Sequence, residues 1–479
     1  MRIAIIGAGP AGIAAGHELL RQGFSEFTIF DALDAPGGTW RLHSYPGLAC
    51  DVWAHSYSFS YAPNPDWSAS FVGFAEIQAY LADCATRFGL DPHLQLNTRI
   101  TRAQYVQLGH WRLQSDTGPL GDFDILINAM GNQHTPLYPN VEGRDSFQGD
   151  SWHATCWNHD VNLTGKKVIV VGSAASAVQI VPEIAKEVGH LTVLQRSANW
   201  IMPRRRKVYS AAQRWRFRHF PMLIKLTRAV QRLMMGQVAY AVTLGHKRMS
   251  QFETMVEKFI NRTIDDPALR KVLLPDSRYG CKRGLVSDDF YPTLNRANVE
   301  LVAEGLARVT STGIVTSGGR EIAADVIIYC TGYKILDYDR FDVIGKDGQN
   351  LGVVMGDESR SHKGISVPGF PNFFFAVGPN GLVLNVSYFV TAERNITTIV
   401  SLLSDLRRSG KQSLEVKKEE FMNYNKAMDE KFARFSWGAP GCHSYYTNKS
   451  GHASFLFPGT FAEYKKLHEE VGLHEYNVA

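Results

Sequence analysis

Two glycine turns of the kind that bind nucleotides occur in this one chain, so it must fold around two strand-turn-helix units. The first turn begins at Gly7 and the second at Gly172, and each follows an apolar run that reads as a buried strand. A charged residue follows each turn at the same spacing, Asp31 after the first and Arg196 after the second. An acid at that place accepts hydrogen bonds from ribose hydroxyls, whereas an arginine pairs with a 2′-phosphate. The sequence therefore predicts FAD in the first site and NADPH in the second.

The first turn is a complete match to the G-x-G-x-x-G pattern. Residues 2–6 read as a strand, Gly7, Gly9 and Gly12 fill the three glycine positions, and residues 13–20 read as a helix. The phosphates of a dinucleotide would lie at the N-terminus of this helix, because unpaired N–H groups and the positive end of the helix dipole converge there. We therefore expect this turn to bind a cofactor.

The second turn departs from the same pattern. Residues 167–171 predict a strand, but Ala174 and Ala177 replace the second and third glycines. A methyl group at position 174 stands where the backbone should approach the pyrophosphate, which would alter cofactor position or affinity. A Rossmann unit that no longer binds a cofactor is the alternative, and Arg196 argues against it. The cofactor contacts expected at this turn are Gly172, Ser173 and Ser176.

The composition is typical of a globular intracellular protein. The chain has 479 residues, of which 44% are hydrophobic, enough for two or three domains with ordinary cores. The first residues already belong to a strand and show no signal-peptide pattern, and no apolar run approaches the ~18 residues of a membrane span. We therefore expect a cytoplasmic location. A net charge of +5 is too mild to indicate nucleic acid as a partner.

The six cysteines are scattered and form no C-x-x-C pair and no zinc-like spacing. This argues against a disulfide scaffold and against a dithiol flavin reductase. The same spacing argues against a metal site, so we expect none.

Positive charge is concentrated in one part of the chain. No Asp or Glu occurs from Val188 to Phe252, where arginines and lysines alternate with large apolar side chains. One interpretation is a helical insertion, over about residues 204–275, with a solvated basic face. The other is an interfacial helix that makes weak contact with an anionic membrane or draws in an apolar substrate. Pro221 should divide any long helix in this segment.

The order of elements predicts an α/β protein with two Rossmann-like dinucleotide-binding domains. Strand and helix alternate through the first half and a long gap separates the turns, so we expect the NADP domain to be inserted into the FAD domain. Two similar apolar runs that end in glycine turns, 124–131 and 325–333, mark the exit from the first domain and the return to it. The expected FAD domain comprises residues 1–140 and 336–479, and the expected NADP domain residues 141–335.

Two segments near the turns resemble fingerprints of one enzyme family. Residues 37–51 fill every fixed position of (A/G)-G-x-W-x-x-x-x-(F/Y)-P-G-x-x-x-D, the pattern of type I Baeyer-Villiger monooxygenases. Residues 147–157 resemble the F-x-G-x-x-x-H-x-x-x-W fingerprint of the same family, although Asn158 stands where the family usually has Pro or Asp. Trp157 favours this family over related N- or S-oxygenating enzymes, which tend to carry Tyr or Phe there. We expect His153 to act in packing and hinge geometry.

The likeness continues along nearly the whole chain. Tyr445 stands where the family often has a tryptophan that contacts the nicotinamide cofactor, so shape or selectivity is expected to differ there. The further matching segments are Q-R-S-A-N-W at 195–200, K-R at 282–283, G-F-P-N at 369–372, G-P-N at 378–380, G-C-H-S-Y at 441–445 and P-G at 458–459.

The resemblance implies an FAD- and NADPH-dependent monooxygenase that converts ketones to esters or lactones with molecular oxygen, through a C4a-peroxyflavin. Arg283 would be the active-site arginine that stabilises the anionic peroxide and its ketone adduct, and Asp51 would orient it. Lys282 and Arg196 would share the 2′-phosphate of NADPH, with a hydrogen bond from Ser197. The remaining expected flavin-site residues are Gly38, Thr39, Trp40, Tyr57 and Asn132.

Three alternatives stay open at the level of sequence. An N- or S-oxygenating enzyme of the same architecture would not need Arg283 in this role. An NADPH oxidase that mostly makes peroxide would follow if the altered second turn held NADP⁺ poorly. A flavin-binding scaffold or membrane-surface adaptor, built on the basic helices, is the non-enzymatic alternative. The patterns carry no information on the particular ketone or on the number of subunits.

Overall fold

A computed structural model describes residues 1–479 except 107–108, 357, 440, 443, 445 and 448–452. The expectation for Tyr445 therefore lies outside the described residues. Among those that are described, no helix is both long and apolar enough to cross a membrane.

The first nucleotide-binding unit is built on a parallel sheet in the order β19-β7-β1-β2-β3. The helix after the first glycine turn, α1 (Pro10–Arg21), packs against α11 (Tyr388–Ser409) from the far end of the chain. The sheet is likewise completed late, because its edge strand β19 follows the whole second unit. Its strands are β1 (Ile3–Ile6), β2 (Phe27–Phe30), β3 (Leu94–Gln95), β7 (Ile125–Asn128) and β19 (Phe373–Phe375).

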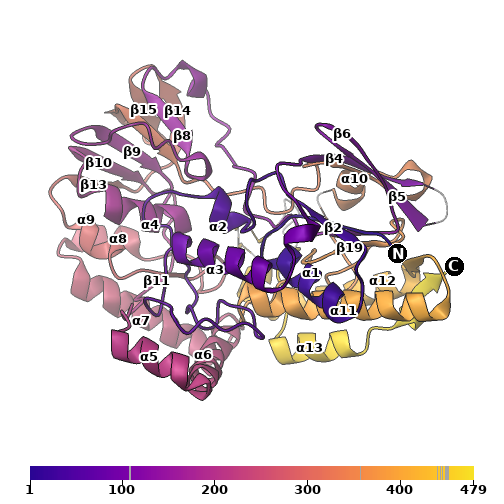
Figure 1. Cartoon of the computed structure of the whole chain (residues 1–479). Coiled ribbons are helices and arrows are strands. Elements are labelled where there is room, and N and C mark those ends of the chain that lie inside the picture. Colours follow the sequence, from indigo (N-terminus) through magenta and orange to yellow (C-terminus); the bar gives the residue numbers. More distant parts are fainter. Residues whose placement is uncertain (107–108, 357, 440, 443, 445, 448–452) are drawn as a thin grey trace.

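A smaller sheet and several helices complete the first unit, on the right of Figure 1. β4 (Ile100–Val106), β5 (His110–Ser115) and β6 (Gly118–Phe123) are antiparallel, and β18 (Asp342–Ile344) pairs parallel with β4. The other elements are α2 (Thr39–Leu42), α3 (Phe74–Arg87), α10 (Leu351–Met355), α12 (Lys418–Phe432), α13 (Phe461–Glu469) and the antiparallel pair β20 (Leu414–Val416) and β21 (Tyr476–Val478).

The second unit has the same plan, with a parallel sheet in the order β13-β10-β9-β17-β8 at the upper left of Figure 1. Helix α4 (Ala175–Ile184) follows its glycine turn. The predicted α/β class with two Rossmann-like units is thus confirmed. The strands are β8 (Asp150–His153), β9 (Lys167–Val171), β10 (His190–Leu194), β13 (Val299–Val302) and β17 (Val326–Tyr329), with an antiparallel sheet of β14 (Leu306–Thr310), β15 (Gly313–Thr316) and β16 (Glu321–Ala323) beside them and α9 (Phe290–Leu294) before β13.

The basic segment forms the predicted helical insertion, at the lower edge of the molecule in Figure 1. Pro221 divides it as expected, because α6 begins at that residue. The short parallel pair β11 (Ile201–Met202) and β12 (Leu285–Val286) closes its base. Its helices are α5 (Ala211–His219), α6 (Pro221–Ala241), α7 (Lys247–Thr263) and α8 (Pro267–Leu273).

Helix α6 belongs to the insertion in the second unit, but its side chains form hydrogen bonds with the first unit. Arg228 donates to the carbonyl of His55 at 2.8 Å and to Ser58 Oγ at 2.9 Å, and Ser56 Oγ donates to Gln231 Oε1 at 2.7 Å. The interpretation of every cation here as part of a solvated face is therefore wrong for Arg228, whose burial lowers its pKa. These contacts fix α6 across the space between the two units.

Asn372, the last residue of the G-F-P-N segment, fastens the first sheet internally. Its fully buried amide donates to the carbonyls of Gly109, Asp124 and Gln412 at 2.9–3.0 Å and accepts from the backbone N–H of Leu414 at 2.9 Å. This part of the family pattern therefore serves the fold.

Replacing Asn372 with alanine should lower the free energy of unfolding by about 3 kcal/mol or more, since each buried polar group left unpaired costs ~1–3 kcal/mol. Urea unfolding followed by circular dichroism measures the loss. Asn97→Ala is the matched control, because Asn97 has a similar left-handed φ (51° against 59°) but is exposed. Equal losses in the two variants would show that backbone strain, and not hydrogen bonding, sets the cost.

Candidate active site

A single cavity of about 1620 Å³ gathers the residues that the sequence singled out. Of the expected catalytic and cofactor-binding residues, all line it except Gly12. Its walls come from both glycine turns, from residues 38–57, from the inner face of the helical insertion and from the segment 382–388. The cavity therefore lies where the two nucleotide-binding units and the insertion meet.

The two glycine turns have nearly the same geometry. Gly7 has φ 110° and Gly172 has φ 109°, a region that residues with a Cβ rarely adopt. A Cβ on Gly7 would lie 2.6 Å from the carbonyl oxygen of Ala129, and one on Gly172 would lie 2.6 Å from that of Cys330. Each turn therefore crosses closely over the chain that leaves the neighbouring strand. This leaves an open backbone cradle of the shape that dinucleotide phosphates need.

Gly12, on α1, packs directly against the first glycine turn. A Cβ at this position would lie 1.8 Å from the carbonyl oxygen of Gly7, so only glycine lets α1 pack this closely on the turn. Gly38 and Gly9 approach one another in the same way, since a Cβ on Gly38 would lie 2.9 Å from the α-carbon of Gly9.

Asp31 lies at the end of β2 with its carboxylate turned to the first cradle. One oxygen accepts from the backbone N–H of Ala8 at 2.6 Å and the other from that of Leu33 at 2.8 Å. Burial raises the pKa of Asp31, and these N–H groups and the charge of Arg340 act against that rise. The carboxylate is thus fixed beside the turn, with lone pairs left for ribose hydroxyls.

Trp40 and Tyr57 form a hydrogen-bonded pair on the same wall. Trp40, on the short helix α2 after Gly38 and Thr39, donates from Nε1 to the Tyr57 hydroxyl at 3.1 Å. The Tyr57 ring packs edge-on against Phe389 at 4.8 Å, and burial raises its pKa well above the usual value. Asn132 reaches the cavity from the turn that follows β7.

Arg283 and Asp51 meet in the cavity although they are far apart in the chain. Arg283 Nη2 lies 2.5 Å from Asp51 Oδ2. Arg283 precedes β12, whereas Asp51 lies in the loop between α2 and α3. Their side chains are 35% and 26% exposed, so the pair is held at the cavity surface and not sealed in the core. A permanent cation of fixed orientation therefore faces the space between the two nucleotide turns.

Two cations gather beside the second turn. Lys282 Nζ donates to Ser197 Oγ at 2.6 Å and to the carbonyl of Ala198 at 3.2 Å. The pKa of Lys282 is lowered, first by burial and also by the charge of Arg196, while Asp276 acts in the opposite direction. Arg196 itself is exposed just beyond β10. Two cations that repel one another beside a hydroxyl form a suitable site for a phosphate group.

Ala174 occupies its turn without strain. It is the N-cap of α4 with φ −89° and ψ −163°, close to the φ −77° and ψ −172° of Gly9 at the N-cap of α1. Because φ is negative, the backbone does not require glycine here. Ala177, at the third glycine position, is completely buried. The departure at 174 therefore adds one methyl group to the cavity lining and leaves the turn unchanged.

Replacing Ala174 with glycine should lower the dissociation constant of NADP⁺ several-fold, because the methyl group no longer limits the approach of the pyrophosphate to the backbone. Glycine is also a better N-cap than alanine, so α4 should not be weakened. Titration of the flavin absorbance with NADP⁺ measures the change. Ala211→Gly, at the start of α5 and outside the cavity lining, is the control. An unchanged constant would mean that the methyl group lies clear of the cofactor.

His153 does not line the cavity. It ends β8, is buried, and its Nδ1 lies 2.8 Å from Thr155 Oγ1. Its ring meets those of Tyr138 and Tyr333 edge-on, at 5.4 and 5.9 Å, and burial lowers its pKa to about 4. This position agrees with packing near the link between the two units.

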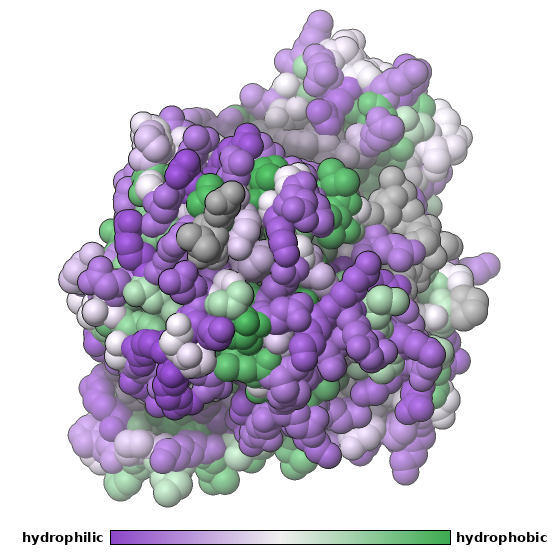
Figure 2. Space-filling model, turned by 90° about the vertical axis from the view of Figure 1, so that its right-hand side faces the viewer, coloured by the Kyte–Doolittle hydropathy of each residue, from purple (hydrophilic) through white to green (hydrophobic). Residues whose placement is uncertain are grey.

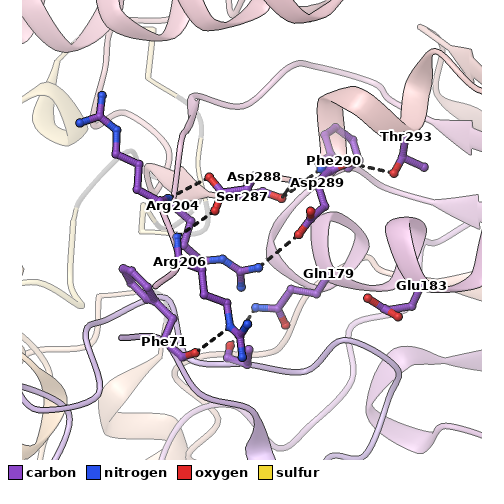
Figure 3. Close-up of polar contacts among 12 residues, drawn as sticks. Phe71, Gln179, Glu183, Arg204, Arg206, Ser287, Asp288, Asp289, Phe290 and Thr293 are labelled. Atoms are coloured by element: carbon purple, nitrogen blue, oxygen red, sulfur yellow. Dashed lines mark hydrogen bonds and ion pairs between the residues drawn. The ribbon is translucent and has the colours of Figure 1, made fainter. Parts of the chain in front are cut away.

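The arginines at the start of the insertion form hydrogen bonds and ion pairs with two other segments of the chain, as Figure 3 shows. The backbone N–H groups of Arg205 and Arg206 donate to Asp288 at 2.8 and 3.0 Å. Arg206 Nε also donates to the carbonyl of Phe71, on the first unit, at 3.2 Å. Arg204 contacts Asp289 at 3.4 Å. One of the two interpretations above places these arginines on a solvated basic face, and their contacts show that they also join the insertion to both units.

Gln179 is a cavity residue that the sequence did not single out. From α4 it donates to the carbonyl of Ala49 at 2.9 Å and accepts from the Tyr45 hydroxyl at 3.2 Å. It therefore ties the second unit to the loop that carries Asp51. No motif marks this glutamine, although both of its partners lie within the 37–51 fingerprint.

Cys281 and Cys442 form a disulfide, which the cysteine spacing did not reveal. Cys281 directly precedes Lys282, so the bridge fastens the cationic segment to the C-terminal part of the chain. Cys50, Cys84, Cys156 and Cys330 are free, so one bridge does not amount to a disulfide scaffold. The signal that could have found the pair is that Cys442 stands inside one matching segment of the family pattern and Cys281 directly before another.

Known proteins similar to this chain agree with the geometry. A family model described as flavin-binding monooxygenase-like matches residues 1–344. A Baeyer-Villiger monooxygenase of Streptomyces coelicolor is 36% identical over 481 residues, covering 100% of this chain and 92% of the relative. One of Pseudomonas aeruginosa is also 36% identical, covering 100% and 91%.

Solved structures agree in turn. An oxidized steroid monooxygenase bound to NADP has a TM-score of 0.87 at 27% identity, with 100% of this chain and 99% of the other covered. A closed cyclohexanone monooxygenase has a TM-score of 0.87 at 26% identity and the same coverage. The chain therefore belongs to the flavin-binding monooxygenase-like family, as one of its Baeyer-Villiger monooxygenases that use FAD and NADPH.

Proposed function

We propose that this protein inserts one atom of molecular oxygen beside the carbonyl of a small ketone, giving an ester or a lactone. The observation that carries the proposal is the Arg283–Asp51 ion pair, held in the cavity that both nucleotide turns line. Relatives named as cyclohexanone and steroid monooxygenases support a ketone as the substrate class.

The residues present fit both cofactors. The glycine cradle beside Asp31 suits the FAD phosphates and ribose, and the cavity wall at Trp40 and Tyr57 suits its ring. When bound and reduced by NADPH, FAD supplies the site at which oxygen is activated. We assign the 2′-phosphate of NADPH to Arg196 and Lys282, because these cations face the second cradle.

Arg283 would stabilise the charge that builds on oxygen as the ketone is attacked. Its guanidinium cannot lose its proton and presents several donors in one plane. Asp51 holds one nitrogen, so the orientation of that plane is set before substrate arrives. Preorganised donors of this kind need no rearrangement during the reaction, which is why they lower the barrier. Apolar side chains such as Leu382, Val383 and Leu456 line the same cavity and would limit the entry of water.

The strand order supports the proposed domain limits. Strands of the first unit end at β7 and resume at β18, whereas β8 to β17 belong to the second. We therefore keep the proposed boundaries near residues 140 and 335, with the helical insertion inside the second domain. A cytoplasmic location stays a prediction of the sequence.

Incubation with a cyclic or aryl ketone beside a thioether tests the proposal. Mass spectrometry should show a product one oxygen heavier from the ketone, in amounts that account for the NADPH consumed, and little hydrogen peroxide. A sulfoxide without an ester would contradict the proposal and indicate an S-oxygenating enzyme. NADPH consumption matched by peroxide alone would indicate an oxidase.

A further inference from the structure

Helix α6 carries large apolar side chains on a face that nothing in the described structure covers. Its inner face is held on the first unit by the contacts of Arg228 and Gln231 given above. On the opposite face four side chains recur at spacings of three and four, and each is between 51% and 71% exposed. A solvent-facing helix surface ordinarily carries polar residues. We name this outer stripe by its members: Met222, Leu226, Val230 and Leu233.

Exposed cations border the outer stripe. Lys225 and Arg232 lie along one edge of it, because helix positions advance by about 100° per residue. No acidic residue occurs from Val188 to Phe252, although the half-buried Glu393 of α11 lies near enough to Arg232 to interact with its charge. Further exposed cations of the same segment are Arg205, Lys207 and Arg216.

Exposed apolar residues elsewhere are not arranged in this way. The face that carries α10 and α12 is turned to the viewer in Figure 2, and there hydrophilic side chains predominate while hydrophobic ones form small separate groups. Met422 on α12 and Val353 on α10 are as exposed as members of the outer stripe, at 59% and 79%. They offer a comparison in which exposure is matched and the continuous stripe is missing.

We propose that α6 docks on an anionic lipid surface, with the outer stripe inserted at the interface and the bordering cations on the headgroup phosphates. An amphipathic helix with large apolar side chains and a cationic flank binds such surfaces in their plane. α5 and α6 lie at the lower edge of the molecule in Figure 1, outside both sheets, so a flat surface can reach them.

Charge argues against a second copy of this chain as the occupant. In a two-fold contact between antiparallel α6 helices through the outer stripe, the edge that carries Lys225 and Arg232 would face the same edge of its copy. Like charges brought together across an interface disfavour association. A lipid surface instead supplies negative charge to the edge of the helix that carries Lys225 and Arg232.

Docking of α6 on lipid would place the cavity next to the membrane surface, where apolar substrates dissolve. This role of the docking rests on the proposed function. Met235 and Val238, on the inner face of α6, line the cavity. Met234 lines it too and is also half exposed, so it stands between the outer stripe and the cavity. An apolar ketone dissolved in the lipid would reach the active site by this short path. The docking itself requires no catalysis.

Co-sedimentation of the full-length flavoprotein with vesicles tests the proposal. At low salt, vesicles of phosphatidylcholine and phosphatidylglycerol in equal parts should bind the protein at least tenfold better than phosphatidylcholine alone. The preference should fall as salt is added, since exposed charges are screened. Leu226→Glu with Leu233→Glu should lower anionic binding at least tenfold, and Lys225→Glu with Arg232→Glu should remove the salt dependence.

Met422→Glu and Val353→Glu are the controls, and both should bind as the unchanged protein does. Turnover of a water-soluble ketone should stay normal in every variant, which shows that each is folded. Equal binding to both vesicle types, no binding, or equal losses in the controls would overturn the proposal. The proposal would also be overturned if the protein formed a dimer, bound no vesicles, and became monomeric on Leu226→Glu. A second copy of the chain would then cover the stripe. Sedimentation needs no oxygenation, so its failure is distinguishable from failure of the proposed function.

Discussion

Arg283→Ala should nearly abolish ester formation while FAD remains bound. Removing one preorganised donor from a site of developing negative charge costs ~3–4 kcal/mol, or about 10²–10³-fold in kcat. The flavin should stay because its cradle is built from backbone and from Asp31, whose carboxylate is held by the backbone N–H groups of Ala8 and Leu33. Product formation is followed by mass spectrometry and flavin content by visible absorbance.

Two further variants separate the role of Arg283 from general damage. Arg278→Ala removes a nearby arginine that pairs with Glu253 at 2.9 Å and does not line the cavity, so its activity should be close to normal. Arg283→Lys keeps the charge but loses the planar donors and should recover only part of the activity. Normal ketone turnover in Arg283→Ala would reject the assignment.

The two nucleotide-binding units could be predicted from local sequence because each is a continuous strand-turn-helix. The strand expected at residues 167–171 is β9 with the same bounds. The helix expected from residue 13 begins instead at Pro10, because proline has the φ of a first helical turn and lacks the N–H that would be unpaired there. Local sequence patterns therefore predict the existence of these strands and helices correctly and miss only the residues at which they begin or end.

The candidate active-site residues could be named from the family pattern, but not the contacts around them. Asp51 and Arg283 stand in separate motifs, and only the fold brings them within 2.5 Å. Contacts between distant segments leave no periodic signal in the sequence. The hydrogen bonds of Gln179, the Cys281–Cys442 disulfide and the packing of α6 on the first unit all depend on such contacts. Arg228 shows the difficulty best, since the nearest cations on either side of it, Lys225 and Arg232, are exposed while its own side chain is half-buried against the first unit.

Arg196→Ala should raise the KM for NADPH about tenfold to a hundredfold and leave that for NADH almost unchanged. Hydrogen bonds to a charged group contribute ~1.5–3 kcal/mol, which is the loss expected for NADPH. NADH has no 2′-phosphate, so its binding does not depend on these hydrogen bonds. Steady-state kinetics with both cofactors measure the ratio. Arg308→Ala is the control, because Arg308 lies on β14 and does not line the cavity. An unchanged ratio in Arg196→Ala would count against the site.

Lys282 makes the size of this effect informative. Because the charge of Arg196 lowers the pKa of Lys282, removing Arg196 should let Lys282 hold its proton more firmly and keep part of the phosphate contact. The double variant, with Lys282→Met added, should therefore lose more preference for NADPH than the two single losses predict. Such non-additivity is expected of two cations that share one ligand group. Strictly additive losses would mean that the two side chains bind different parts of the cofactor.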